Sequence, residues 1–139
     1  MIELDNRTSF EVNKTLLSKI ANSYTNKEIE LIITNNDEIQ SINKEHRDID
    51  TPTDVLSFPY ADMPMSPLGS IIISLDYIQE KAKELGHSEN DECALLFIHG
   101  LLHLLGFDHE VDNGEMREEE QKTINMLNLP KSLIIRTQG

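Results

Sequence analysis

An apolar run over residues 94–105 is interrupted by two side chains with strong polar chemistry, His99 and His103. Four residues turn an α-helix by about 400°, so both imidazoles project from one face and can reach the same ion. Gly106 tolerates the left-handed conformation that ends many helices. The reversed chain can then bring back His109 as a third ligand. The stretch therefore predicts a buried helix that presents imidazoles to a metal.

A simpler interpretation is that these histidines are core residues with ordinary hydrogen-bond partners, as most buried histidines are. However, the helix is apolar on almost every side, which indicates burial, and a buried imidazole without a partner costs about 1–3 kcal/mol. An ion shared by the imidazoles removes that cost. Three imidazoles with an open fourth position are typical of catalytic zinc sites, whereas structural zinc sites usually have four protein ligands. We expect one zinc ion on His99, His103 and His109, although such ligands also suit nickel, copper or iron.

The length of 139 residues suits one domain, residues 1–139, with a substantial core. The order of strand-like and helix-like patterns predicts an α+β fold, in which helices, one of them a metzincin-like zinc helix, pack on a small mixed sheet of about four strands. Thr8 and Glu11 match a capping box and place the start of the first helix at residue 9. The expected strands are 2–5, 28–34, 54–59 and 70–74, and the expected helices are 9–24, 37–47, 76–85, 90–105 and 112–127.

Targeting signals and cysteines bear on localisation. The N-terminal residues lack the basic start and apolar run of a signal peptide, and the run around His99 is too short and too interrupted to cross a bilayer. The single cysteine, Cys93, permits no internal disulfide, and we interpret it as a small buried thiol. These features predict a cytoplasmic protein with no membrane partner.

The formal net charge of −13 counts against tight, non-specific binding of nucleic acid, which usually relies on a basic surface. Much of the acid is local, as in Glu118, Glu119 and Glu120, which we interpret as a solvated face of the last helix. A small basic pocket, or a substrate delivered by a partner, remains compatible with this charge.

The spacing His103-x-x-Gly106-x-x-His109 matches that of metzincin peptidases. Zinc peptidases of the H-E-x-x-H type place a glutamate directly after the first histidine as general base. Here that position is Gly100, which we expect to open space beside the metal. An ion at this site can still lower the pKa of a bound water to about 7. Phosphodiester cleavage instead requires stabilisation of negative charge at phosphorus, a task suited to arginine.

Two blocks of sequence resemble one known family. The run H-G-L-L-H-L-L-G-F-D-H at 99–109 resembles the signature H-G-x-x-H-L-x-G-[YF]-D-H of the YbeY family, bacterial metal-dependent endoribonucleases of ribosomal RNA maturation. The runs N-K-E-H-R at 43–47 and T-D-V-L-S-F-P at 53–59 resemble a second block of that family. The resemblance covers residues 2–129. The family usually has an aspartate where this chain has Ser70, so any ion pair or cap made by that aspartate is in doubt here.

The resemblance implies that the three histidines hold one zinc ion and that Arg47 faces it across a cleft. Chemistry supports this role, because a guanidinium offers a planar bidentate fork to phosphate and stays charged at any working pH. The alternative is an arginine at a helix C-terminus that interacts only with the helix dipole.

Other polar residues have competing interpretations. Asp108 either orients a ligating imidazole or caps the turn after the zinc helix. Asp54 and Ser57 lie on a strand that resembles the cleft wall of the family. His87 follows a glycine that ends a helix, and we expect its side chain to donate hydrogen bonds to the free carbonyl groups there. Met116 is expected to pack beneath the zinc helix.

The resemblance implies a single-strand-specific, zinc-dependent endoribonuclease in ribosomal RNA processing, at the 3′ end of 16S ribosomal RNA, and in ribosome quality control. Single strands fit a metal at the bottom of a cleft, which cannot easily reach a phosphate in a regular duplex. Because the chain is so acidic, we expect a small-subunit ribosomal protein or an assembly GTPase to deliver the RNA. A zinc metallopeptidase and a non-catalytic, metal-binding ribosome assembly factor are the alternatives.

Overall fold

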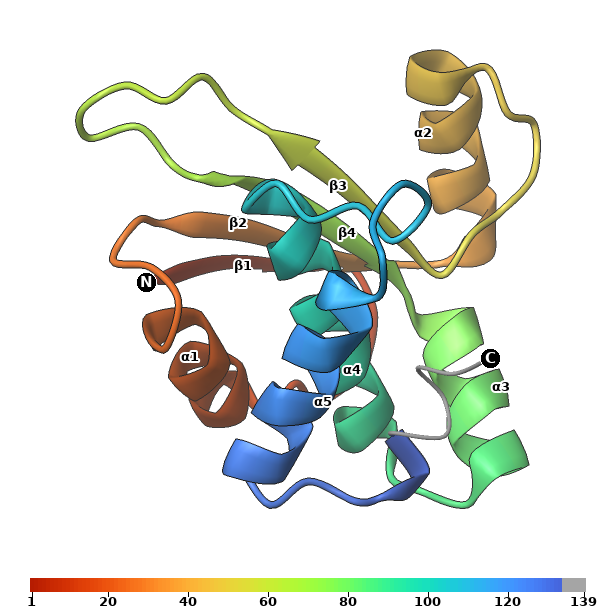
Figure 1. Ribbon diagram of the computed structural model, residues 1–139. Coiled ribbons are helices and arrows are strands. Elements are labelled where there is room, and N and C mark those ends of the chain that lie inside the picture. The colour runs from red at the N-terminus through yellow and green to blue at the C-terminus, as the bar shows by residue number, and fades with distance from the viewer. Residues whose placement is uncertain (134–139) are drawn as a thin grey trace.

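A four-stranded mixed sheet forms the centre of the computed structural model, which describes residues 1–133 (Figure 1). The strand order is β1-β2-β4-β3, with β1, β2 and β4 parallel and β3 antiparallel to β4. The α+β prediction is therefore confirmed. The strands are β1 (Ile2–Asn6), β2 (Ile29–Thr34), β3 (Val55–Pro59) and β4 (Gly69–Ser74), and the helices are α1 (Lys14–Asn22), α2 (Asn36–Arg47), α3 (Leu75–Leu85), α4 (Glu89–Leu104) and α5 (Glu115–Met126).

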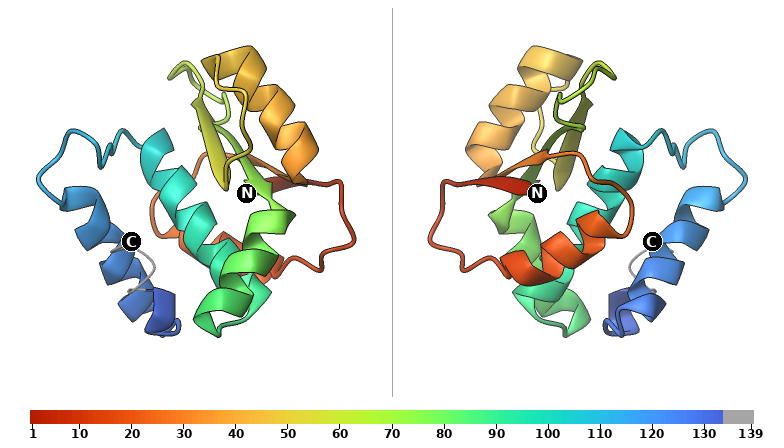
Figure 2. Two further views of the ribbon diagram at one scale, coloured as in Figure 1. Left: turned by 90° about the vertical axis from the view of Figure 1, so that its right-hand side faces the viewer. Right: turned by 90° about the vertical axis from the view of Figure 1, so that its left-hand side faces the viewer.

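The two faces of the sheet bury different clusters, because successive side chains of a strand point to opposite faces. Ile71 and Ile73 of β4 belong to the main core, which includes most of α4. Ile72, between them, joins a smaller cluster with Leu56 of β3 and Ile39 of α2. Thus α2 covers one face of the sheet, while α4 lies on the other face (Figure 2).

Helix α4 is buried on nearly all sides, which explains why its sequence is apolar all round. It contacts β3 and β4 of the sheet and three helices, α1, α3 and α5. Its N-terminus is capped by Ser88, whose side chain accepts a hydrogen bond of 3.1 Å from the Asp91 amide. Polar side chains near its C-terminal end can therefore reach solvent only through an opening between these neighbours.

The predicted start of the first helix was wrong. Helix α1 begins at Lys14, and the Asn13 side chain accepts a hydrogen bond from the Leu16 amide as its cap. Thr8 instead stabilises a preceding turn, where its hydroxyl accepts a hydrogen bond from the Phe10 amide. A capping-box pattern is thus present in sequence, but the chain is still turning away from β1 at that point.

The last helix also begins later than predicted, at Glu115. The Asp112 carboxylate, at the position where we expected the helix to start, accepts hydrogen bonds from the Gly114 and Met116 amides. These bonds lower the pKa of Asp112. Within residues 1–133, no helix combines the length and apolar character needed to span a membrane.

Candidate metal centre

Three imidazoles meet at the C-terminal end of α4. The Nε2 atoms of His99 and His103 are 3.2 Å apart, and the two rings are nearly perpendicular. The chain then reverses through Gly106, which has a φ of 100°, and returns His109 so that its ring centroid lies 5.3 Å from that of His99. One ligand atom from each histidine lies within 4.8 Å of the others. The structure thus brings together the three residues that the spacing singled out.

The geometry of this cluster fits a zinc ion. Tetrahedral Zn–N bonds of about 2.0–2.1 Å place ligand nitrogens about 3.3–3.4 Å apart, close to the separation of the first two imidazoles. An imidazole must be neutral to bind a metal. Burial lowers the pKa of His103, and the neighbouring His99 lowers it further. Both effects favour the neutral form of His103, which is the form that binds a cation.

The second ring nitrogens of His99 and His103 have their own partners, which fixes the orientation of both rings. His103 Nδ1 lies 3.0 Å from the Phe107 carbonyl oxygen, to which it can donate. His99 Nδ1 faces Oε1 of Glu120 on α5 at 3.4 Å. Both contacts leave Nε2 available for an ion, as in many metal sites where an acceptor holds the ligating imidazole.

Glu120 was missed by the sequence analysis, which assigned it to a solvated face of the last helix. The prediction was wrong for this residue, because Glu120 is only 4% exposed. A signal was present in the sequence, since Glu120 lies four residues after Met116 and four before Ile124, on an otherwise apolar stripe of the helix. In the structure all three residues are buried. A carboxylate on such a stripe needs a partner, and the imidazole of His99 provides one.

Gly100 does not open space beside the metal, as we had expected, but lies against the sheet. A Cβ atom at this position would lie 2.9 Å from Cγ2 of Ile71 and 3.1 Å from Oγ of Ser57. The Ser57 hydroxyl donates a hydrogen bond of 3.0 Å to the Gly100 carbonyl. The missing side chain therefore lets α4 approach β3 and β4, and Ser57 ties the helix to the edge strand.

Asp54 positions the beginning of β3. Its carboxylate accepts a hydrogen bond of 2.8 Å from the Val55 amide, and its backbone carbonyl accepts one from the Ser74 amide. Ser70, where the family usually has an aspartate, pairs with Phe58 in the sheet and does not line the cleft described below. The side chain that stands in place of the family aspartate is therefore not part of the cleft lining in this chain.

A cleft of about 590 Å³ opens over the three histidines. Its floor is α4, one wall is β3 with the end of α2, and the other wall is the segment after α4 together with α5. Figure 2 shows this arrangement, with α4 between α5 on one side and β3 and α2 on the other. The lining side chains are Arg47, Thr53, Asp54, Val55, Leu56, Ser57, Pro59, Leu95, Leu96, His99, His103, Asp108, His109, Glu110, Arg117 and Glu120.

Two arginines line this cleft from opposite walls. Arg47, which was predicted to face the metal, is the last residue of α2, and Arg117, which was not predicted, lies in the first turn of α5. Asp108 also lines the cleft, where its carboxylate accepts a hydrogen bond of 3.0 Å from the Glu110 amide. This contact matches the turn-capping alternative for Asp108. Among residues 1–133, no hydrogen bond joins its carboxylate to an imidazole nitrogen.

The remaining singled-out residues lie outside the cleft. Contrary to the prediction, the ring of His87 does not donate hydrogen bonds to the carbonyl groups at the helix end. Its Nε2 contacts Glu92 Oε1 and its Nδ1 contacts Ser132 Oγ, both at 2.8 Å. Cys93 is buried, as predicted, and burial raises the pKa of its thiol to about 12. Met116 is fully buried in the same core as α4, which confirms its predicted packing role.

Comparison with known proteins gives consistent matches along the chain. The sequence model of the family described as "Endoribonuclease YbeY" matches residues 2–128. A protein of that name from Sulfurimonas denitrificans is 63% identical, and the match covers 100% of both chains. Another from Aliarcobacter butzleri is 61% identical over 98% of this chain and 99% of that relative. The solution structure of a Thermotoga maritima protein is similar, with a TM-score of 0.60, 26% identity, and coverage of 96% and 89% of the two chains.

Proposed function

Because the chain belongs to the endoribonuclease YbeY family, we propose that it is a zinc-dependent endoribonuclease that cleaves single-stranded RNA during ribosomal RNA maturation. The observation that carries this proposal is that three imidazoles and the guanidinium of Arg47 line one cleft. An ion on His99, His103 and His109 supplies an activated water and a positive charge when it is bound.

Arg47 supplies the second positive charge. Within residues 1–133 it forms no ion pair, so its guanidinium is available for a phosphate. Two parallel N–H donors fit two phosphate oxygens, and their attraction grows as negative charge develops in the transition state. Arg47 therefore binds and orients the scissile phosphate and neutralises its charge.

The residues around the imidazoles position them. Glu120 and the Phe107 carbonyl hold the Nδ1 atoms of His99 and His103, which directs both Nε2 atoms into the cleft. Ser57 fixes the end of α4 against the edge strand through the Gly100 carbonyl. These contacts hold the ligands in position before the ion binds, so that binding requires little further loss of side-chain entropy.

The natural substrate of the proposed enzyme is a particular site on ribosomal RNA. We infer that it is the 3′ end of 16S ribosomal RNA, cleaved in the cytoplasm in maturation and in ribosome quality control. With a net charge of −13, the free protein as a whole is repelled by RNA. A small-subunit ribosomal protein or an assembly GTPase therefore presents the RNA to the cleft. A submicromolar affinity of the free protein for random single-stranded RNA at physiological salt contradicts this delivery step.

A zinc metallopeptidase is the first alternative. The position that carries the glutamate base in H-E-x-x-H peptidases is Gly100, which lies against Ile71 with no space for a side chain. The carboxylate of Glu120 is nearby but faces the Nδ1 atom of His99. The cleft thus supplies an arginine for phosphate and lacks the peptidase base in its usual position.

The proposal is tested with purified protein incubated with single-stranded RNA and, separately, with unfolded casein, each with and without a chelator. Metal analysis of the same preparation identifies the ion. We expect about one equivalent of zinc, RNA cleavage that the chelator abolishes, and intact casein. Arg47→Ala is expected to retain the metal and lose cleavage by a factor on the order of 1000, as when other charge-stabilising groups are removed. Cleavage of casein alone contradicts the proposal.

The second alternative is a non-catalytic metal-binding assembly factor, and processing of ribosomal RNA in cells distinguishes it from a nuclease. Arg47→Ala and His103→Ala should both leave unprocessed 3′ ends of 16S ribosomal RNA if the chain cleaves RNA. Normal 3′ ends with both variants leave only a binding role. The matched control is Lys44→Ala, which removes a cation from an exposed position of α2 that does not line the cleft.

A further inference from the structure

Arg117 has no role in the chemistry above, although it lines the same cleft as Arg47. Among the described residues there are three arginines, and only Arg7 is held in ion pairs, with Asp5 and Glu38. The two arginines without an ion pair in this part of the chain are Arg47 and Arg117. The whole chain has 25 acidic and 12 basic residues, and both guanidinium groups that lack an ion pair within residues 1–133 line one cleft.

The position of Arg117 is unfavourable for the stability of its own helix. Gly114 is the N-cap of α5, so Arg117 is its third residue. The N-terminus of a helix carries partial positive charge, which favours acidic side chains and disfavours a cation. A glutamate at this third position can also bond back to the N-cap amide. The two acidic residues of the same turn, Glu115 and Glu118, follow that preference. Arg117 departs from it, although its charge is attracted by the Asp112 carboxylate and helps the backbone amides bonded to that group to lower its pKa.

The two guanidinium groups come from opposite walls. Arg47 ends α2 beside β3, and Arg117 lies on α5. Helix α4, which carries His99 and His103, lies between these elements, as the ribbon in Figure 2 shows. A single strand that crosses the cleft places one phosphate at the histidines and others toward the walls. Grooves for single-stranded nucleic acid follow the backbone in this way with a series of cations.

We propose that Arg117 binds a phosphate flanking the scissile one and so positions single-stranded RNA across the cleft. This inference rests on the proposed function, because its first test measures cleavage of RNA. Arg117 is a binding and positioning residue, and Arg47 acts at the reacting phosphate. Substitution of Arg117 should therefore raise KM and leave kcat nearly unchanged.

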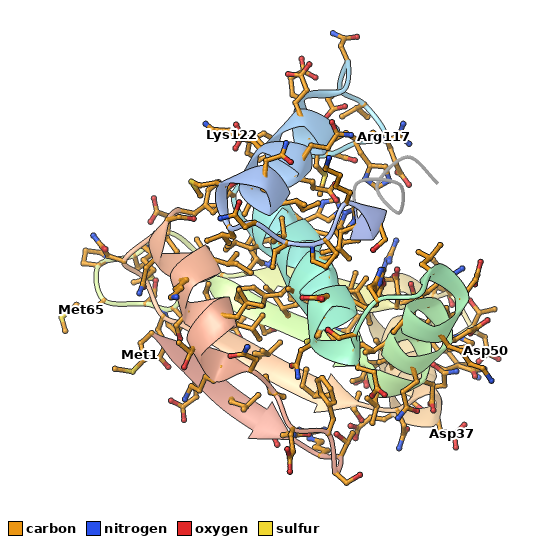
Figure 3. All side chains as sticks on the ribbon, turned by 90° about the horizontal axis from the view of Figure 1, so that it is seen from below. Met1, Asp37, Asp50, Met65, Arg117 and Lys122 are labelled. Carbon is orange, nitrogen blue, oxygen red and sulfur yellow. The ribbon has the colours of Figure 1, made fainter. Side chains whose placement is uncertain are left out.

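The test compares Arg117→Gln with Lys122→Gln, which removes the same charge from the same helix. Figure 3 shows the two side chains pointing to different sides of α5, and Lys122 does not line the cleft. On a short single-stranded RNA with the metal-loaded protein, we expect Arg117→Gln to raise KM about tenfold, as expected for loss of a charge-assisted contact. Its logarithmic salt slope should fall by about 0.7, as expected for one lost phosphate contact on a single strand. Lys122→Gln should change KM less than about twofold.

Arg117→Lys keeps the charge, so it should restore the salt slope and recover part of the KM. The melting temperature should change little in Arg117→Gln, because removing a cation from a helix N-terminus is favourable while losing its attraction to the Asp112 carboxylate is unfavourable. Equal KM values for Arg117→Gln and Lys122→Gln overturn the inference. A loss confined to kcat also overturns it, since that result places Arg117 at the scissile phosphate.

A separate binding measurement distinguishes failure of this inference from failure of the proposed function. Fluorescence anisotropy of a labelled single-stranded RNA is recorded with Arg47→Ala protein, with and without Arg117→Gln. Weaker binding on addition of Arg117→Gln supports the role of Arg117 even if the wild-type protein proves unable to cleave RNA. Unchanged binding rejects that role even if cleavage by the wild type is confirmed.

Discussion

Two histidine–glutamate pairs lie at opposite ends of α4, and they differ in how many ring nitrogens remain available. In the pair at the N-terminal end of the helix, His87 and Glu92 are almost completely buried, with 2% and 0% of their side chains exposed. Both ring nitrogens of His87 have partners, since the second one contacts Ser132. In the cleft pair, Glu120 contacts one nitrogen of His99, and the side chain of His99 is 26% exposed.

The difference shows that a histidine and a glutamate can form either a structural contact or part of a metal site. The partner of the ring nitrogen that does not contact the glutamate decides which. At His87 this nitrogen contacts the hydroxyl of Ser132, so no ring nitrogen is left for an ion. At His99 it meets a second imidazole, His103, across 3.2 Å, an arrangement that an ion relieves. Burial separates the pairs as well, because an ion needs access from solvent.

His99→Ala should have the largest effect. Loss of one of three ligands is expected to release the ion and to lower RNA cleavage by a factor on the order of 1000 or more, because the metal supplies the activated water. Metal content by mass spectrometry and cleavage rate are measured together. His87→Ala, at the other pair, should retain the full metal content. If both variants lose the metal equally, the distinction between the pairs is wrong.

His87→Ala should have the next largest effect, on stability. The substitution removes hydrogen bonds from buried Glu92 and from Ser132 and leaves a cavity, so the free energy of unfolding should fall by about 2–3 kcal/mol. Urea denaturation measures this change. His46→Ala, at an exposed position of α2, is the matched control and should change it by less than about 0.5 kcal/mol. A smaller loss at His87 than at His46 contradicts the structural role.

Glu120→Gln should weaken metal binding by about 10–100-fold while the fold is preserved, since loss of a partner that holds a ligating imidazole typically has an effect of this size. Competition with a chelator of known affinity measures it. Glu118→Gln, on the exposed side of the same helix, should have no such effect. An unchanged affinity in Glu120→Gln indicates that the contact with His99 does not assist the ion.

The smallest effect concerns pH and the start of α5, which carries Glu120. The Gly114 and Met116 amides lower the pKa of Asp112, so the ionised cap is stabilising in the folded state. Its contribution is present above the ordinary pKa of an aspartate and is lost as the pH falls through the lowered folded value. Thermal melts from neutral to acidic pH should therefore show a steeper loss of stability in the wild type than in Asp112→Asn. Parallel curves contradict this role.

The sequence predicted the parts of the fold that depend on local spacing. The i, i+4 separation places His99 and His103 on one face wherever the helix packs, and Gly106 permits the reversal that returns His109. Strands β2 and β4 followed equally from their isoleucine-rich runs. All of these features are set by neighbours in sequence, so tertiary contacts did not alter them.

The starts of α1 and α5 were misplaced through local cap contacts, at Asn13 and Asp112. The errors in the site arose where a contact joins distant segments. Helical spacing cannot tell which neighbour Gly100 faces, because that depends on how closely α4 approaches β3. Glu120 reaches His99 only because the segment between α4 and α5 folds back, a path that periodicity does not encode. Arg117 likewise joins the cleft through that path, whereas Arg47 was found from a resemblance and not from spacing.

The close packing of Gly100 has an evolutionary consequence. Some glycine and glutamate codons differ by a single base, so one mutation can place the peptidase glutamate after the first histidine of this helix. Here that side chain would overlap Ile71, and α4 would have to move away from the sheet to accept it. That movement would also break the bond between Ser57 and the helix. The contact between helix and sheet thus acts as a steric barrier against a glutamate directly after the first histidine in this chain.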